Sequence, residues 1–218
     1  MNSSLANPLY KKSALFVGDS LCQALYEQNI PNFGDGFGWA GRIMQMNEMS
    51  GTNGGISGAS LSDCRGLNVI INQLKKQAGN SFDYVILEGG VNDAWDAAPL
   101  GNIQDGDEFD PKTFAGALEY AFKFTKESFP DAKIGYIIAY QMPASPVESL
   151  VDMSAYFDLA KEICKKWEIP YLDLYSDEDF NKTQMKTSTN ECLYDFIHPN
   201  TKGYNTITPV INDWMKTL

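Results

Sequence analysis

The chain has little basic charge and a single histidine. Lysine and arginine number 17 against 28 aspartate and glutamate residues, which gives a formal charge of -11 over 218 residues. A surface with this negative excess repels phosphate groups, so we expect neither nucleic acid nor an anionic membrane surface as a partner. Because His198 is the only histidine, any chemistry that needs an imidazole must use this one residue.

Long apolar runs and paired cysteines are also missing. No run of about 18 apolar residues is present that could span a bilayer. The first residues lack a basic segment followed by an apolar core, so the sequence predicts no signal peptide. We therefore expect a cytoplasmic protein, or a secreted one if a leader was removed. The cysteines show no C-x-x-C spacing, which favours free thiols over a disulfide framework or a metal site. They are Cys22, Cys64, Cys164 and Cys192.

Two segments resemble cofactor or metal loops only superficially. Residues 34–39 begin like a dinucleotide fingerprint, but the third glycine is displaced and no strand directly precedes it. Residues 105–110 resemble the start of a calcium loop, yet its sixth position is Asp110 instead of glycine and its twelfth is Gly116 instead of glutamate. We interpret the first as a loop beside the functional site and the second as a solvated acidic loop. The sequence predicts no cofactor and no metal.

Apolar runs and helical periodicities alternate along the chain. Such alternation favours an α/β fold with a doubly wound parallel sheet. The length fits one domain over 1–218, with 1–12 as a poorly structured N-terminal arm. The expected strands cover about 14–18, 51–55, 83–88, 133–139 and 170–174. The expected helices cover about 20–29, 39–46, 63–77 with Asp63 as the cap, 111–128, 149–167 and 201–216.

The turn Gly18-Asp19-Ser20 directly follows the first expected strand and precedes a helix. Ser20 would then lie at the carboxyl edge of the sheet, where ligands bind in this class of fold. Its backbone N–H would lie in the first helical turn, where unpaired donors and the helix dipole favour developing negative charge. Such a serine is either a nucleophile or a helix cap. We expect Asp19 only to shape the turn.

A serine nucleophile needs a base, and the base needs an acceptor that orients it. His198 and Asp195, three residues apart near the C-terminus, have the chemistry for these two roles. Two more turns follow expected strands: the small-residue loop 53–60, which contains Gly58, and the segment Gly90-Val91-Asn92-Asp93. Taken singly, each is compatible with ordinary turn chemistry. We expect Asp93 to form hydrogen bonds within its own loop.

Together, the four blocks resemble the SGNH hydrolases, also called GDSL esterases and lipases. Their order is Gly-Asp-Ser, Gly, Gly-x-Asn-Asp and Asp-x-x-His, and the resemblance covers about residues 13–205. It implies a three-layer α/β/α fold, flavodoxin-like, with five parallel strands in the order 2-1-3-4-5. It also implies a catalytic triad of Ser20, His198 and Asp195. The oxyanion hole would consist of the backbone N–H groups of Ser20 and Gly58 and the side-chain amide of Asn92.

The sequence says least about the substrate. Trp39, Trp95 and Tyr140 are candidate flat faces for a sugar ring, although aromatics near strand ends are commonly core residues. The acidic segment 94–110 follows Asn92, so we expect it to form a wall or lid of the site and to disfavour anionic substrates. The preferred interpretation is a serine esterase that removes a short acyl group, such as an O-acetyl group from a carbohydrate. The alternatives are a lipase or thioesterase for longer chains and a non-catalytic glycan-binding module on the same fold.

Overall fold

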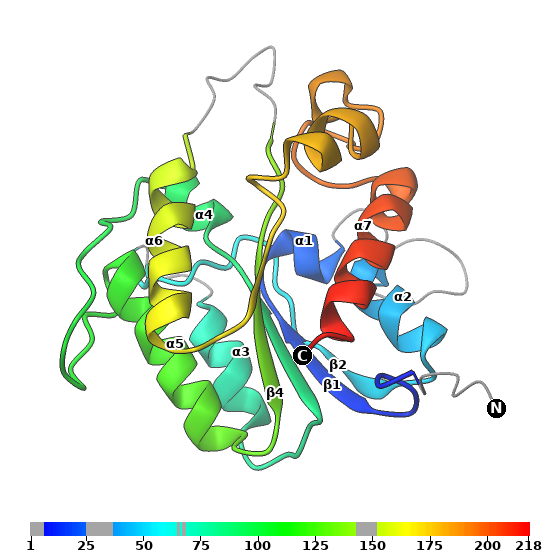
Figure 1. The fold of residues 1–218 in the computed structure, drawn as a ribbon. Coiled ribbons are helices and arrows are strands. Elements are labelled where there is room, and N and C mark those ends of the chain that lie inside the picture. Colours follow the sequence, from blue (N-terminus) through cyan, green and yellow to red (C-terminus); the bar gives the residue numbers. More distant parts are fainter. Residues whose placement is uncertain (1–6, 25–36, 65, 67–68, 143–151) are drawn as a thin grey trace.

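One sheet of five parallel strands lies at the centre of the computed structural model, which describes residues 7–24, 37–64, 66, 69–142 and 152–218. The strand order is β2-β1-β3-β4-β5, as expected. Helices cover both faces of the sheet, so the three-layer α/β/α fold is confirmed (Figure 1). The strands are β1 (Ser13–Val17), β2 (Ser50–Asn53), β3 (Tyr84–Glu88), β4 (Lys133–Ile138) and β5 (Tyr171–Asp173).

The helices divide into two layers (Figure 1). One layer contains α3 (Ile70–Gln77), α5 (Phe114–Ser128) and α6 (Ser154–Lys166). The other contains α2 (Gly38–Met46) and α7 (Thr201–Met215). Two short helices, α1 (Ser20–Gln23) and α4 (Val91–Trp95), follow β1 and β3 directly at the carboxyl edge of the sheet. A π-helical turn, η2 (Phe180–Gln184), and a 3-10 turn, η3 (Thr187–Thr189), precede α7.

The central strand β3 is buried along its whole length because helices cover both faces of the sheet. Its first four residues are apolar or aromatic, but its last residue is Glu88, which is only 2% exposed. The register pairs Val17 of β1 with Leu87 of β3. The turn that follows β1 therefore begins beside the carboxyl group of Glu88.

Side-chain caps fix where the two longest helices begin. The Oγ1 of Thr113 accepts a hydrogen bond from the N–H of Gly116 at 3.2 Å at the start of α5. The Oδ1 of Asn200 accepts one from the N–H of Gly203 at 3.1 Å at the start of α7. Each cap satisfies a donor that has no partner inside its helix. The helix expected from residue 111 consequently begins at Phe114.

Two expected helices depart most from the structure. The helix predicted over 20–29 ends at Gln23, because Ala24 adopts the left-handed conformation with φ 63°; residues 25–36 lie outside the described residues. Asp63 does not cap α3, which begins only at Ile70 and has no side-chain cap. The backbone N–H of Asp63 instead donates to the carbonyl of Pro111 at 2.7 Å. That partner is distant in sequence, so the local pattern could not predict it.

The N-terminal arm is more ordered than expected over residues 7–12. Leu9 is fully buried in the core, and the backbone N–H of Lys11 donates to the carbonyl of Asn47 at 2.9 Å. The Nδ2 of Asn7 also donates to the Oδ1 of Asn47 at 2.7 Å. The prediction of a poorly structured arm is therefore wrong for these residues; residues 1–6 lie outside the described ranges. Across the described ranges, no helix combines the length and the apolar character needed to cross a bilayer.

Candidate active site

The carboxyl edge of the sheet brings Ser20 and His198 together from opposite ends of the chain. The Oγ of Ser20 lies 2.8 Å from the Nε2 of His198, and the Nδ1 of the same ring lies 2.8 Å from the Oδ2 of Asp195. Because an ionised carboxylate can only accept, the ring proton belongs on Nδ1. Nε2 is then left as the acceptor for the Ser20 hydroxyl proton. The three residues form one continuous hydrogen-bonded chain.

Hydrogen bonds within the loop hold the imidazole in this position. The Oδ1 of Asp195 accepts from the backbone N–H groups of Ile197 at 3.1 Å and His198 at 2.8 Å. Phe196, which directly follows Asp195, has a φ of 65°, a backbone conformation that residues other than glycine rarely adopt. The hydroxyl of the buried Tyr140 donates to the carbonyl of Ile197. The tight turn between base and carboxylate is thus fixed both from within and from the end of β4.

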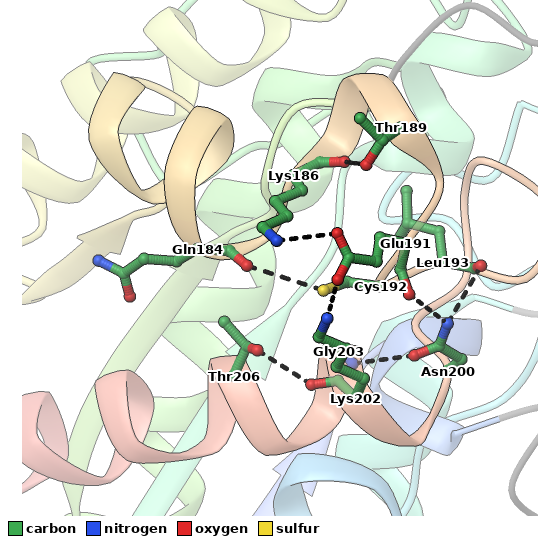
Figure 2. A network of polar contacts seen from close by, with 10 residues as sticks. All are labelled: Gln184, Lys186, Thr189, Glu191, Cys192, Leu193, Asn200, Lys202, Gly203 and Thr206. Atoms are coloured by element: carbon green, nitrogen blue, oxygen red, sulfur yellow. Dashed lines mark hydrogen bonds and ion pairs between the residues drawn. The ribbon is translucent and has the colours of Figure 1, made fainter.

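A second polar network connects the start and the end of the loop 191–200 to α7 (Figure 2). The carboxylate of Glu191 pairs with the ammonium groups of Lys186, at 2.9 Å, and Lys202. The hydrogen bonds from these two lysines lower the pKa of Glu191 to about 2. The Nδ2 of Asn200, which also caps α7, donates to the carbonyls of Glu191 at 3.0 Å and Leu193 at 3.3 Å. Both ends of the segment that carries Asp195 and His198 are therefore attached to one helix.

Three turns meet at Asn92 in α4. The Nδ2 of Asn92 donates to the carbonyl of Ala59 at 2.8 Å and to the Oδ2 of Asp19 at 3.3 Å. Gly58, beside Ala59, has a φ of 73°, and a Cβ added there would meet no atom within 4 Å. The backbone at Gly58 therefore borders open space. The amide of Asn92 connects the turn after β1 with the loop after β2.

Asp93 holds the loop after β2, not its own loop as expected. Its carboxylate accepts from the backbone N–H groups of Leu61 and Ser62, both at 2.8 Å, and from the hydroxyl of Ser62 at 2.6 Å. Burial raises the pKa of Asp93, while the bonds from Ser62 and Leu61 oppose that rise. The Asn-Asp pair in α4 therefore anchors the Gly58 loop at two points.

Asp19 and Glu88 form a buried carboxyl pair below Ser20. The Oδ1 of Asp19 caps α1 by accepting from the N–H of Leu21 at 2.8 Å. Burial raises the pKa of Asp19 to about 6, although the hydrogen bond from the Leu21 N–H opposes this. The Oε2 of Glu88 accepts from the backbone N–H of Asp19 at 3.3 Å. Burial and the negative charge of Asp19 raise the pKa of Glu88 well above its usual range.

No role is assigned to Glu88 from the sequence alone, although the sequence pattern around this residue is unusual. It is a carboxyl group at the end of an otherwise apolar strand, directly before two glycines. Charged side chains are almost never fully buried unless they are paired. An acidic residue at the carboxyl end of a central strand therefore indicates a site that binds protons or polar groups.

The three aromatic candidates differ in exposure. Trp39 is 3% exposed, and its ring packs edge-on against Phe16 with centroids 5.3 Å apart, so it is a core residue. Tyr140 is 2% exposed and uses its hydroxyl on the Ile197 carbonyl. The prediction of a substrate-facing ring is therefore corrected for both residues. Trp95, at the end of α4, is 39% exposed and remains a candidate.

Much of the acidic segment 94–110 lies away from the site. The backbone N–H of Gln104 donates to the buried Glu119 of α5 at 2.9 Å, and the ring of Phe109 lies 6.0 Å from that of Trp167. Trp167 directly follows α6, close to where β5 begins, so these contacts lie toward the amino edge of the sheet. The expectation of a wall or lid is wrong for 104–109, because this part contacts Glu119 within α5 and Trp167 at the end of α6.

The four cysteines are free thiols, and only Cys64 is exposed. Within the described ranges, no three His, Cys, Asp or Glu side chains are grouped so as to hold a metal ion.

The sequence model of the GDSL-like Lipase/Acylhydrolase family matches residues 16–206, nearly the whole chain. This chain belongs to that family. It is accordingly a hydrolase that acts on esters. None of the curated proteins matches it in sequence.

Solved structures share the fold of this GDSL-family chain at low sequence identity. A protein from Lactobacillus plantarum has a TM-score of 0.78 and 19% identity, with 95% of this chain and 98% of that chain covered. A Bacteroides ovatus protein, named as GDSL-like lipase, has a TM-score of 0.69 and 18% identity, with 95% and 99% covered. A variant of Axe2, an acetyl-xylooligosaccharide esterase from Geobacillus Stearmophilus, has a TM-score of 0.65 and 18% identity, with 94% of each chain covered. At such identities the likeness establishes the fold.

Proposed function

We propose that the chain is a serine esterase that hydrolyses short-chain carboxylic esters through an acyl-enzyme intermediate. In this proposal Ser20 is the nucleophile, His198 the general base and acid, and Asp195 the group that orients the imidazole. One observation carries it: the Oγ of Ser20, both ring nitrogens of His198 and the Oδ2 of Asp195 form a chain with 2.8 Å at each step. Such an arrangement is the geometry that serine hydrolysis requires.

The reaction proceeds in two halves. The Oγ of Ser20 bonds to the ester carbonyl carbon while its proton passes to the Nε2 of His198, and the carbonyl oxygen becomes an oxyanion. The bond to the alcohol then breaks, the alcohol takes the proton from Nε2, and Ser20 remains acylated. Water attacks the acyl group in the same manner, its proton passes to Nε2, and the acid leaves as the proton returns to Ser20. Asp195 stabilises the imidazolium in both halves.

The oxyanion would be met by the backbone N–H groups of Ser20 and Gly58 and by the amide of Asn92. The open space beside Gly58 supports this assignment, because an acyl group can approach the backbone there. The two bonds of the Asn92 amide also support it. The bond to Ala59 at 2.8 Å keeps the amide in place, and the longer contact with Asp19 at 3.3 Å leaves the second hydrogen able to be shared with the oxyanion.

The charge around the site favours a neutral ester. Asp19 directly precedes Ser20, and Asp195 lies on the far side of the His198 ring, so negative charge here, together with the formal charge of -11, disfavours anionic substrates. The name of the structural neighbour Axe2, an acetyl-xylooligosaccharide esterase, supports an O-acetyl group on a carbohydrate as the substrate. The exposed ring of Trp95 offers an apolar face for the sugar.

The test compares the hydrolysis of acetyl, butyryl and octanoyl p-nitrophenyl esters by the wild type and by Ser20→Ala and His198→Ala. We expect the acetyl ester to be preferred, and each variant to lose about 10³-fold or more in kcat. Ser81→Ala, at an exposed serine before β3, is the matched control and should leave the rate unchanged. An undiminished rate in either variant refutes the triad, and a preference for octanoyl refutes the short-chain assignment. A wild type that binds acetylated oligosaccharides without releasing acetate would make the chain a binding module.

A further inference from the structure

Glu88 is a buried carboxyl group at the active-site edge that no step of the proposed reaction uses. It lies at the end of the central strand β3, beside the turn that carries Ser20. A Cβ added at Gly18 would come within 2.7 Å of the Oε2 of Glu88. The glycine before Asp19 is therefore what lets this carboxyl group reach the turn.

The contacts of Glu88 lead to the proposed oxyanion hole in two steps. Its Oε2 accepts from the backbone N–H of Asp19 at 3.3 Å, which places the Glu88 carboxyl group next to Asp19. Asp19 in turn accepts from the N–H of Leu21 at 2.8 Å and from the Nδ2 of Asn92 at 3.3 Å. Asp19 thus accepts from two donors, and Glu88 in turn accepts from the backbone N–H of Asp19.

The surroundings of Glu88 require that it carries a proton. Its Oε1 is buried and has no hydrogen-bond partner among the described residues. The adjoining cavity of about 20 Å³ has a mostly apolar lining that includes Leu21, Trp39 and Ile137. An ionised Glu88 would hold one oxygen without a donor against this lining and lie beside the negative charge of Asp19, whereas a protonated one can donate to Asp19. Asp19 has the Leu21 and Asn92 donors to stabilise its negative charge, so Asp19 is the anion of the pair.

We propose that protonated Glu88 is a positioning residue for ester hydrolysis: it donates to Asp19, keeps Asp19 ionised, and thereby holds Asn92 and the Ser20 turn in their active geometry. The inference rests on the proposed function above. When Glu88 loses its proton, two adjacent negative charges repel each other, and Asp19 moves away from Asn92. Activity then declines on the alkaline side. The other titratable groups that face this pair are Cys22 of α1, Asp93 of α4, Tyr136 within β4, Tyr140 just after β4, and His198.

The experiment compares kcat and KM for p-nitrophenyl acetate between pH 5 and pH 10 in the wild type, Glu88→Gln and Glu88→Leu. Glutamine keeps the shape of the protonated acid and still donates to Asp19, so we expect a kcat within about threefold of the wild type and no alkaline decline of its own. Leucine cannot donate, so we expect kcat to fall about tenfold or more with KM changed less than about threefold. Glu119→Gln, at another fully buried glutamate far from the site, should leave the pH profile unchanged.

Two results would overturn the inference. A folded Glu88→Gln variant as inactive as Glu88→Leu would show that the charged form is needed, and a Glu88→Leu variant with wild-type kcat would show that no positioning is needed. Infrared spectroscopy on the wild type tests the protonation of Glu88 even if a Glu88 variant does not fold. Wild type with ¹³C-labelled glutamate should show the band of a protonated carboxyl group at pH 7, and Glu119→Gln should keep it; its absence refutes the inference. Full activity of Ser20→Ala would refute the proposed function and leave this band unchanged.

Discussion

The amide of Asn92 has two acceptors at rest, and only one of them is close. Asn92→Ala removes the side-chain donor proposed for the oxyanion but leaves Ser20 and His198 in contact. We expect kcat to fall by about 100- to 1,000-fold, because one such donor contributes about 2.7–4 kcal/mol to the transition state. KM should change little. Asn80→Ala, at an exposed asparagine whose amide contacts Gln77, is the control. A variant of Asn92 with near-normal kcat would exclude this amide from the oxyanion hole.

The second prediction at this scale concerns the hydroxyl of Tyr140, which supports the turn that carries His198. Tyr140→Phe leaves the carbonyl of Ile197 without its partner, which costs about 1–3 kcal/mol of stability and loosens the turn that holds the imidazole. We expect a severalfold lower kcat at unchanged KM. A contact with substrate would raise KM instead. Tyr84→Phe is the matched control, since the hydroxyl of this buried tyrosine donates to the Pro8 carbonyl at the amino edge of the sheet.

At the scale of single residues, chemistry could be predicted from the sequence and burial could not. Ser20, Asp195 and His198 belong to residue types that can perform only a few roles, and the resemblance of their sequence blocks to a known family indicated that they would meet. Trp39 and Tyr140 have rings that suit either a core or a binding face. The choice between the two depends on which side chains pack against them, such as Phe16 against Trp39, and that is a property of the folded chain.

At the scale of elements, the loop between η3 and α7 is held by the helix that follows it (Figure 2). Asn200→Ala removes the cap of α7 and the two donors to the carbonyls of Glu191 and Leu193. We expect a loss of about 0.5–2 kcal/mol from the cap, measured by urea unfolding, and a lower kcat because Asp195 and His198 lose their support.

Thr113→Ala provides the comparison for Asn200→Ala because Thr113 caps α5, which lies in the other helical layer. Its stability should fall by a similar amount, about 0.5–2 kcal/mol, while kcat stays unchanged. If both variants lose activity in proportion to their stability, the loop network has no specific role. If only Asn200→Ala loses activity, the network in Figure 2 positions the base.

The elements themselves were predictable where a repeating pattern defines them. Buried parallel strands and amphipathic helices such as α5 and α7 carry their periodicity in the sequence. The errors occurred where a contact distant in sequence determines the position of a segment or the start of a helix. The acidic segment leaves the site because Gln104 and Phe109 contact α5 and the end of α6, and the expected cap at Asp63 is instead bonded to Pro111.

At the scale of the whole molecule, the buried acids set how stability depends on pH. Burial raises the pKa values of Glu88, Asp19 and Asp93, that of Asp19 to about 6. An unfolded chain loses these protons near pH 4, whereas the folded chain keeps them to higher pH. The free energy of unfolding therefore falls as pH rises from about 4 through the folded pKa values. The lowered pKa of Glu191 acts in the opposite direction: its contribution is complete above its unfolded pKa of about 4.3 and is lost as pH falls from there to about 2.

The formal charge of -11 also lowers the free energy of unfolding as pH rises, as the buried acids do, because repulsion between carboxylates grows as they ionise. Salt separates the two effects, since about 1 M salt shortens the screening length to about 3 Å and weakens only the repulsion between exposed charges. We therefore expect urea unfolding to give a lower free energy at pH 8 than at pH 5 even in 1 M NaCl. Glu88→Gln should flatten this slope, because its amide does not titrate, while Glu119→Gln should not. A free energy that rises from pH 5 to pH 8 in high salt would mean that the buried acids fold in their ionised forms.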